Sequence, residues 1–288
     1  MAAVDLSVEE LADDAISYLG ELLAPVSSMS TILGPDSPRV KSTGTSGGVY
    51  QVEVTNAVPA SADNVANYET GLTSGTQTNV SVTTASVSVL QTITNLQQQQ
   101  GITFNTRVED ASKGLAQGIW DKCTAMMNGA GFTDAGAITA GSLTTANLTD
   151  LRSNVDSMNV SLLLEHIEAG PIYPTDKNSF QLMETGAYGF NSIYVVSNFT
   201  GGVTNQVALA ADPKCSVAVT GLGLQESQAA QLVQGSSLIE NFTIESIGVP
   251  VEMRVWQNTA TKDLHMTLET IFGISAADTS AAAFLDHA

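Results

Sequence analysis

The chain is poor in charge, and above all in positive charge. Only 14% of its 288 residues are charged, and 10 lysines and arginines stand against 29 aspartates and glutamates, giving a formal net charge of −19. No run of Lys or Arg occurs anywhere in the sequence. Because phosphate neutralisation requires clustered basic side chains, this composition argues against direct, tight binding of nucleic acid.

Cysteines and long apolar runs are also scarce. The two cysteines, Cys123 and Cys215, lie far apart in apolar contexts, which favours buried, reduced thiols of a cytosolic protein over a disulfide. The first residues, MAAVDLSVEELADD, lack the basic and apolar regions of a secretory signal. No stretch reaches the roughly 18 apolar residues of a membrane span, so we expect a chain without membrane contact.

What replaces charge is uncharged polar sequence. Hydrophobic residues make up 43% of the chain, which is close to the globular average, so an ordered protein is expected. Ser, Thr, Asn, Gln, Ala and Gly fill the place that charged residues usually take. Because burying charge is costly, such a surface suits a protein that covers much of its outside with neighbouring molecules.

The first half predicts two helices and a long hairpin between them. Residues 5–24 carry apolar side chains at helical spacing, and residues 107–128 predict a second, long helix with a continuous apolar stripe. Gly114 and Gly118 in that helix predict close packing against a neighbouring strand or helix. Residues 49–58 and 78–94 alternate with period two and are rich in β-branched residues, as in an antiparallel hairpin with a long polar tip.

The second half predicts a mixture of helices and strands. A loop after residue 129 leads to an amphipathic helix over 148–169, and residues 191–198 predict a strand covered on both faces. Short helices are expected at 174–184 and 225–233, with one or two strands in 205–220. Residues 247–258 and 262–273 predict a second hairpin, followed by a small-residue tail over 275–288 that we expect to be weakly structured.

The sequence offers little catalytic chemistry. His166, His265 and His287 have no second ligand at metal-binding spacing, so each is expected at a surface or edge position. The segment GLGLQE begins like a dinucleotide-binding loop, but Glu226 stands where a third glycine is required. No nucleophile elbow or Walker sequence occurs. We therefore expect no catalytic residue, no metal and no cofactor, and a protein that is not an enzyme.

The order of the predicted elements resembles the HK97-like fold of tailed-phage major capsid proteins, which encapsulins share. It runs through an N-terminal helix, a long polar hairpin, a long helix, a further helix, a mixed α/β segment and a terminal hairpin. This α+β arrangement covers nearly the whole chain. The resemblance implies five parts: an N-terminal arm at 1–38, an E-loop hairpin at 39–96, a P-domain with its spine helix at 97–146, an A-domain at 147–246, and returning P-domain strands with the C-terminal tail at 247–288.

The resemblance implies a capsid subunit that assembles in the host cytoplasm into hexamers and pentamers of an icosahedral virion shell. Double-stranded DNA would be packaged without sequence-specific binding, since an acidic wall repels it. Partners would be other copies of the chain, a scaffolding protein, a portal protein and, in some shells, a cement protein. Four hairpin-tip residues are expected to contact a neighbouring subunit: Asn67, Tyr68, Glu69 and Leu72.

Several alternatives stay open on the sequence alone. An encapsulin would enclose a cargo enzyme instead of DNA, and Tyr68 could equally be a half-buried aromatic of its own hairpin. A tail or decoration protein is disfavoured by the long helix at 107–128, and an α/β enzyme would be a monomer.

Two departures narrow the resemblance. Val49–Leu96 contains no Lys, so the isopeptide bond that some family members form from this loop cannot occur. Only about 38 residues precede the first strand pattern, which leaves no room for a built-in scaffolding segment, so we expect a separate one. A two-stranded arm is marginal alone, and we expect a neighbouring subunit to support it.

Overall fold

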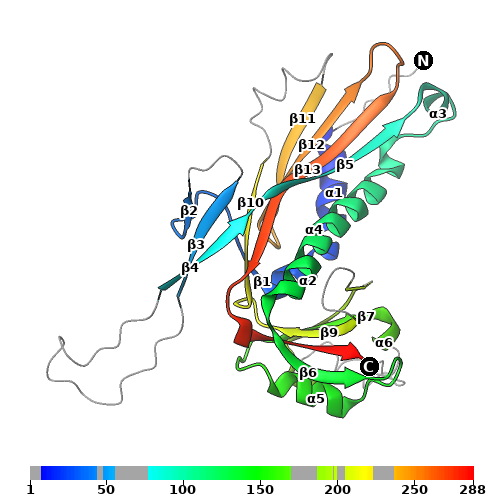
Figure 1. Cartoon of the computed structure of the whole chain (residues 1–288). Helices are drawn as coiled ribbons and strands as arrows, with labels where there is room; N and C mark the ends of the chain where they lie inside the picture. Colours follow the sequence, from blue (N-terminus) through cyan, green and yellow to red (C-terminus); the bar gives the residue numbers. More distant parts are fainter. Residues whose placement is uncertain are drawn as a thin grey trace.

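The computed structural model describes residues 8–43, 48–55, 77–169, 187–196, 198–199, 205–222 and 237–288 (Figure 1). Its α-helices are α1 Val8–Leu22, α2 Ala24–Met29, α3 Asn95–Gln99, α4 Val108–Ala130, α5 Thr145–Ser153 and α6 His166–Ala169. Its strands are β1 Ser30–Leu33, β2 Val40–Ser42, β3 Val49–Thr55, β4 Gln77–Thr83, β5 Ala85–Ile93, β6 Thr133–Ile138, β7 Ser161–Glu165, β8 Ser192–Val196, β9 Gln206–Ala211, β10 Ser216–Gly221, β11 Ser237–Ile244, β12 Val249–Gln257, β13 Leu264–Ala276 and β14 Ala282–His287. The predicted helices at 5–24 and 107–128 and both predicted hairpins are confirmed.

A six-stranded sheet forms the long axis of the molecule, and β13 is its central strand (Figure 1). Residues 264–272 of β13 pair antiparallel with β5. The same strand pairs with β12 through 264–269 and with β10 through 271–276. A strand has only two edges, so β12 and β10 follow one another along the edge that β5 leaves free.

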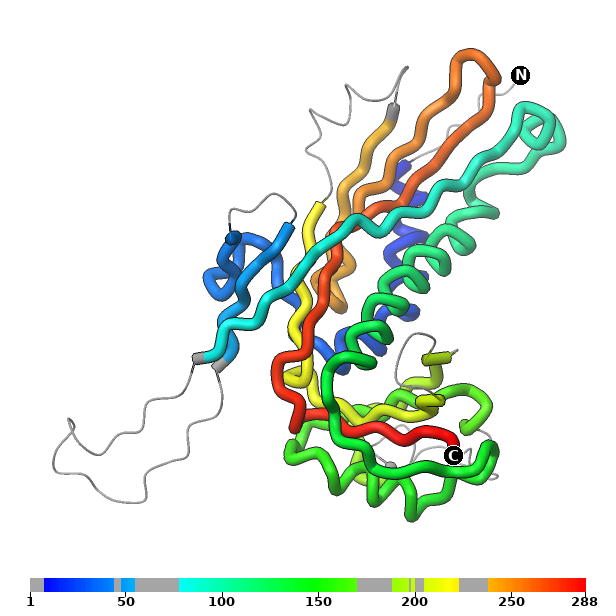
Figure 2. The backbone as a smooth tube through the Cα atoms, viewed as in Figure 1, coloured from blue at the N-terminus to red at the C-terminus, as the bar shows by residue number. Residues whose placement is uncertain are grey.

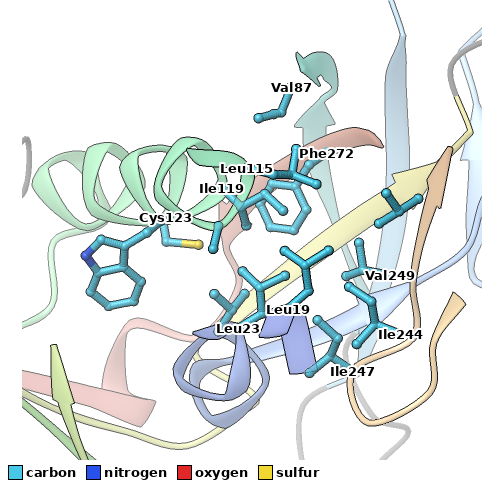
Figure 3. Close-up of a cluster of buried hydrophobic side chains, with 14 of the residues drawn as sticks. Leu19, Leu23, Val87, Leu115, Ile119, Cys123, Ile244, Ile247, Val249 and Phe272 are labelled. Atoms are coloured by element: carbon cyan, nitrogen blue, oxygen red, sulfur yellow. The ribbon is translucent and has the colours of Figure 1, made fainter. Parts of the chain in front are cut away.

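The helices α1 and α4 cover one face of this sheet, and the main core lies between the two layers (Figure 2). Leu19 of α1 and Leu115 and Ile119 of α4 are completely buried in that core against Val249 and Phe272 of the sheet (Figure 3). The stripe predicted for residues 107–128 is therefore the face of α4 that packs on the sheet, as its helical period requires.

The two glycines of α4 bring the helix unusually close to β5. A Cβ atom built on Gly118 would lie 2.7 Å from Cγ1 of Val87, and one on Gly114 would lie 3.2 Å from Cγ2 of Val89. Valine is stiff about χ1 and cannot easily turn away. The close packing expected of these small residues is confirmed, and its partner is a strand of the same chain.

We expect Gly118→Leu to lower the free energy of unfolding by about 3 kcal/mol, because the new side chain forces α4 away from Val87. Gly129→Leu is the matched control, since nothing lies within 4 Å of a Cβ there. Urea denaturation of the two variants measures the difference. Equal stabilities would show that the helix and strand separate without cost.

A second, five-stranded sheet lies beyond the C-terminal end of α4, in the order β6-β14-β9-β7-β8 (Figure 1). Its strands come from separate parts of the chain, with β6 and β14 pairing parallel. Leu148 and Leu151 of α5 are buried on one face, and Leu163 and Leu209 of the sheet join the main core on the other. The two sheets are therefore bound by one continuous apolar core.

A third sheet, β2-β3-β4, projects from the side of the molecule (Figure 1). Strands β3 and β4 pair antiparallel in continuous register, from Val49 opposite Thr83 to Thr55 opposite Gln77. The chain then continues through Thr84 directly into β5. Strand β4 of the projecting hairpin and strand β5 of the long sheet are therefore consecutive parts of one nearly continuous strand.

The helix predicted over 148–169 is wrong beyond Ser153. The segment instead forms α5, then β7, and the short α6. Leu162 and Leu164 are buried on one face of β7 and Leu163 on the other, because helices and core residues cover both sides of the sheet. Consecutive apolar residues fit a helix or a doubly covered strand equally well. The capping residue is Thr144, whose hydroxyl accepts from the Asn147 backbone.

Two further expectations are wrong. Strand β8 is confirmed as a strand, but it is an edge strand and Val195 is 43% exposed. The 275–288 tail is ordered, since β14 lies between β6 and β9 with residues 282–285 buried. A run of alanines gives no clear helix or strand pattern in a sequence, although alanine fits well between closely packed layers.

The edge strand β6 and strand β11 were not predicted, and the helices expected at 174–184 and 225–233 lie outside the described residues.

Candidate assembly surfaces

The predicted tip contacts Asn67, Tyr68, Glu69 and Leu72 lie outside the described residues. The structure describes the base of the hairpin, which consists of β2, β3 and β4. Val40, Val52 and Val82 of this hairpin base are buried against Val217 and Val219 of β10. The hairpin base therefore rests on its own chain, so intramolecular packing supplies the support that the sequence led us to expect from a neighbour.

A close crossing joins the hairpin base to the long sheet. The Thr84 backbone amide donates to the Gly48 carbonyl at 2.9 Å, and the Thr84 hydroxyl donates to the same oxygen at 2.8 Å. Beneath this bend, a Cβ on Gly273 of β13 would lie only 2.4 Å from the Thr83 carbonyl oxygen. Sequence reasoning did not single out Gly273, because nothing local distinguishes it from other strand glycines. This crossing fixes the point at which the hairpin strand β4 leaves the long sheet.

The hairpin base also holds a polar contact at its outer edge. Both Nε and Nη2 of Arg39 donate to the backbone carbonyl of Glu53, at 3.1 and 3.0 Å. Lys41 lies 4.0 Å from the Glu53 carboxylate, but its side chain is 70% exposed, so this pair adds little stability. The arginine ties the strand preceding the hairpin to β3.

A buried ion pair lies on the sheet face opposite α4. Arg254 donates through Nη2 to a carboxylate oxygen of Glu252, two residues earlier on β12. The two side chains are only 11% and 3% exposed. Within the part of the chain that the structure describes, Nε of Arg254 and the second oxygen of Glu252 have no hydrogen-bond partner. Such a pair costs desolvation and is expensive to break.

The histidines have structural partners. His287 of β14 lies with Nε2 2.8 Å from Oε1 of Glu168, a fully buried carboxylate that also accepts from the Gly141 amide at 2.6 Å. His265 lies 2.9 Å from the Thr92 hydroxyl and stacks on Trp256. The first contact ties the C-terminal strand to α6 and to the loop before α5.

Over the described ranges, no group of three or more His, Cys, Asp or Glu side chains is placed to hold a metal ion. In those same ranges, no helix is long and apolar enough to cross a membrane. Gly221 and Leu222 begin the GLGLQE segment at the end of β10, while residues 223–226 lie outside the described part.

Both cysteines are free and buried, as expected from the sequence. Burial raises the pKa of the Cys123 and Cys215 thiols above the ordinary range, because an apolar core disfavours the thiolate. We expect neither thiol to react with a thiol-specific reagent at pH 8 in the folded protein, and both to react after denaturation. Fast labelling of the native protein would contradict this burial.

No family model matches the sequence, and no curated protein matches it either. Several solved shells do match in structure. The virus-like particle from Pyrococcus furiosus aligns over 96% of this chain and 98% of its own, at 11% identity and a TM-score of 0.52.

Two other shells give similar values. The capsid of the cyanophage P-SCSP1u aligns over 90% of this chain and 86% of its own, at 9% identity and a TM-score of 0.50. The capsid of an empty GTA particle aligns over 93% and 90%, at 12% identity and a TM-score of 0.50. All three alignments cover at least nine tenths of this chain. The α+β chain described here therefore has the HK97-like fold of phage capsid subunits.

Proposed function

We propose that the chain is the major capsid protein of a tailed bacteriophage. It self-assembles into hexamers and pentamers of an icosahedral shell that encloses double-stranded DNA. The observation that carries this proposal is the match of the whole fold, over about nine tenths of both chains, to shell subunits. An assembly role also suits the projecting hairpin, whose ordered base extends away from the body (Figure 1).

The parts of the chain take the roles that the resemblance implies. Residues 1–38 form the arm and 39–96 the E-loop, whose tip residues Asn67, Tyr68, Glu69 and Leu72 contact a neighbouring subunit. We assign residues 97–146 and 247–288 mainly to the P-domain and 147–246 mainly to the A-domain. The exceptions are β10 and β11, which pair within the six-stranded sheet of β12 and β13, and β6 and β14, which pair within the five-stranded sheet of β7, β8 and β9. Many weak contacts of this kind add through multivalency.

The proposed partners follow from assembly. A separate scaffolding protein directs shell formation in the host cytoplasm, a portal protein occupies one vertex, and a cement protein is an optional addition in the virion. The packaged DNA meets a wall of subunits that each carry a formal net charge of −19, and it is enclosed without sequence-specific contacts. The subunit performs no catalysis.

Shortening the hairpin tests the proposal. We replace residues 56–76 by a short Gly-Ser turn, which leaves Val52, Val82 and the apolar contact with β10 in place. The variant should unfold at nearly the wild-type temperature and yet form no closed shells in electron micrographs. A second variant keeps the wild-type length but carries residues 56–76 in scrambled order. It separates the need for a long tip from the need for its particular side chains. Normal shells from the shortened variant would contradict the assembly role.

The shell should be held by non-covalent contacts alone. Since Val49–Leu96 contains no Lys, no isopeptide bond can start from β3, from β4 or from the segment that joins them. Boiled particles should therefore run as a single band of 29.9 kDa on a denaturing gel. A ladder of linked subunits would contradict this expectation.

An encapsulin-type compartment that encloses a cargo enzyme is the second candidate. It is favoured by the alignment to the virus-like particle, which covers 96% of this chain and 98% of that one. The contents of purified particles discriminate the two. Nuclease-protected DNA supports the phage capsid, whereas a co-purifying enzyme without DNA supports the compartment.

A further inference from the structure

The loop that joins α5 to β7, residues 154–160, carries a methionine that lies almost entirely in water. Met158 is 94% exposed, whereas the other exposed large apolar side chains among the described residues are 37% to 65% exposed. A single exposed apolar residue is common on a protein surface and needs no explanation by itself. Met158 differs from such a residue because the backbone around it is fixed.

The guanidinium of Arg152 holds this loop to the turn before β8. It donates through Nε to the Gly189 carbonyl at 2.9 Å and through Nη2 to the Ser157 carbonyl. Its Nη1 donates to a third carbonyl, within the same loop, at 2.9 Å. Ser157 and Gly189 are the chain neighbours of Met158 and Tyr188, so one planar group binds the two turns that carry these side chains.

Further hydrogen bonds complete the fixation of the loop. The Asn191 amide donates to the Val160 carbonyl at 2.8 Å, and the Asn191 side chain donates to Oδ1 of Asn159 at 2.6 Å. The Ser157 hydroxyl donates to the buried carboxylate of Asp212 and accepts from the Asn159 amide at 3.1 Å. A loop that is ordered in advance loses little conformational entropy when it binds, which favours affinity.

Tyr188 adds a second partly exposed apolar side chain beside the same guanidinium. It is 37% exposed, and its backbone φ of 57° lies in the left-handed region, which a bulky side chain rarely adopts. Met158, Asn159, Tyr188 and Asn191 together form what we call the Met158–Tyr188 patch, and none of the four carries a charge. The nearest exposed carboxylate of the loop, Asp156, lines a separate hollow beside the hairpin base.

We propose that the Met158–Tyr188 patch is a contact between copies of this chain, in which Met158 inserts into the surface of an adjacent copy. Each copy carries a formal net charge of −19, so copies repel one another and their contacts are favoured on uncharged surface. A flexible, polarizable thioether adapts to an irregular apolar surface, whereas it offers nucleic acid no charge to pair with. The choice of a second copy as the partner rests on the proposed shell function.

Oxidation of Met158 by hydrogen peroxide tests the contact, because exposed methionines are converted to the sulfoxide. In the dilute, unassembled chain Met158 should oxidise rapidly. Met253 and Met266, which are completely buried, should stay protected and serve as internal controls. In assembled shells the oxidation of Met158 should be slower by about tenfold or more, as its burial in a contact requires. Mass spectrometry of peptides from both samples measures the two rates.

Two substitutions at the same position separate the contact from the fold. Met158→Asp should raise the chain concentration needed for assembly about tenfold, because a carboxylate would have to be buried between copies. Met158→Leu is the matched control and should assemble like the wild type. Both variants should unfold at the wild-type temperature, since the side chain is 94% exposed in the isolated subunit.

The outcomes distinguish this proposal from the shell function. Shells in which Met158 oxidises as fast as in the free chain, or normal assembly of Met158→Asp, would overturn the patch and leave the capsid function standing. Small oligomers that protect Met158 but never close into shells would overturn the capsid function and leave the patch as a contact between copies. A chain that stays monomeric at every concentration would overturn both.

Discussion

Gly273→Ala is expected to lower the free energy of unfolding by about 3 kcal/mol, a large effect for one methyl group. The new Cβ would lie 2.4 Å from the Thr83 carbonyl oxygen and 2.8 Å from both the Thr83 carbonyl carbon and Thr84 Cα. These are backbone atoms, so no side chain can rotate to make room. The bend between β4 and β5 must move instead. Urea denaturation measures the loss.

Two other glycines serve as matched controls. Nothing lies within 4 Å of a Cβ built on Gly34 or Gly129, so alanine fits at both. Gly129→Ala should even stabilise α4, by about 1 kcal/mol, because alanine is the better helix former. The account of the crossing would be wrong if Gly273→Ala were as well tolerated as these two.

Breaking the buried ion pair is expected to have the other large effect. Arg254→Met leaves the Glu252 carboxylate, which is 3% exposed, without its cation, and this should cost about 4 kcal/mol. Removing both charges with Glu252→Leu and Arg254→Met should restore most of the lost stability. The reason is that a buried ion pair stabilises a protein little more than apolar side chains of similar size do. Thermal and urea unfolding of the three variants measures these differences.

The comparison of single and double variants is the decisive part of this test. A surface pair would give single-variant losses of about 0.5 kcal/mol and no recovery in the double variant. That result would show that solvent reaches the pair and that its burial is not maintained. Lys113→Met is a control for charge removal, because the pair it forms with Glu109 is exposed.

The sequence predicts the amphipathic helices and alternating strands well, because their periods are local properties. Leu115 and Ile119 recur at helical spacing, and Val80 and Val82 alternate along their strand. The order of these elements was enough to suggest the fold. Sequence comparison would have missed it, since the solved shells are only 9–12% identical.

What the sequence could not predict depends on contacts between distant segments. Leu162–Leu164 fit a helix until β8 and β9 pair with them on either side. The C-terminal strand looked weak because alanine is ambiguous alone, yet it takes an interior position in the five-stranded sheet, between β6 and β9. Gly273 matters only because Thr83 passes over it.

The hairpin base shows how folding and assembly are divided in this chain. Its valines rest on β10, so the projecting ribbon starts from a fixed position in the isolated subunit. A preordered hairpin loses less conformational entropy when it binds a neighbouring subunit than a free segment does. This is why we expect shortening the tip to prevent assembly while leaving the subunit folded.

Electron microscopy of the purified full-length chain, alone and with its scaffolding partner, tests the central claim most directly. A capsid subunit should give closed icosahedral shells in which hexamers and pentamers are resolved and each hairpin overlaps an adjacent subunit. A chain that stays a 29.9 kDa monomer by size exclusion and shows no particles under either condition would contradict the shell function.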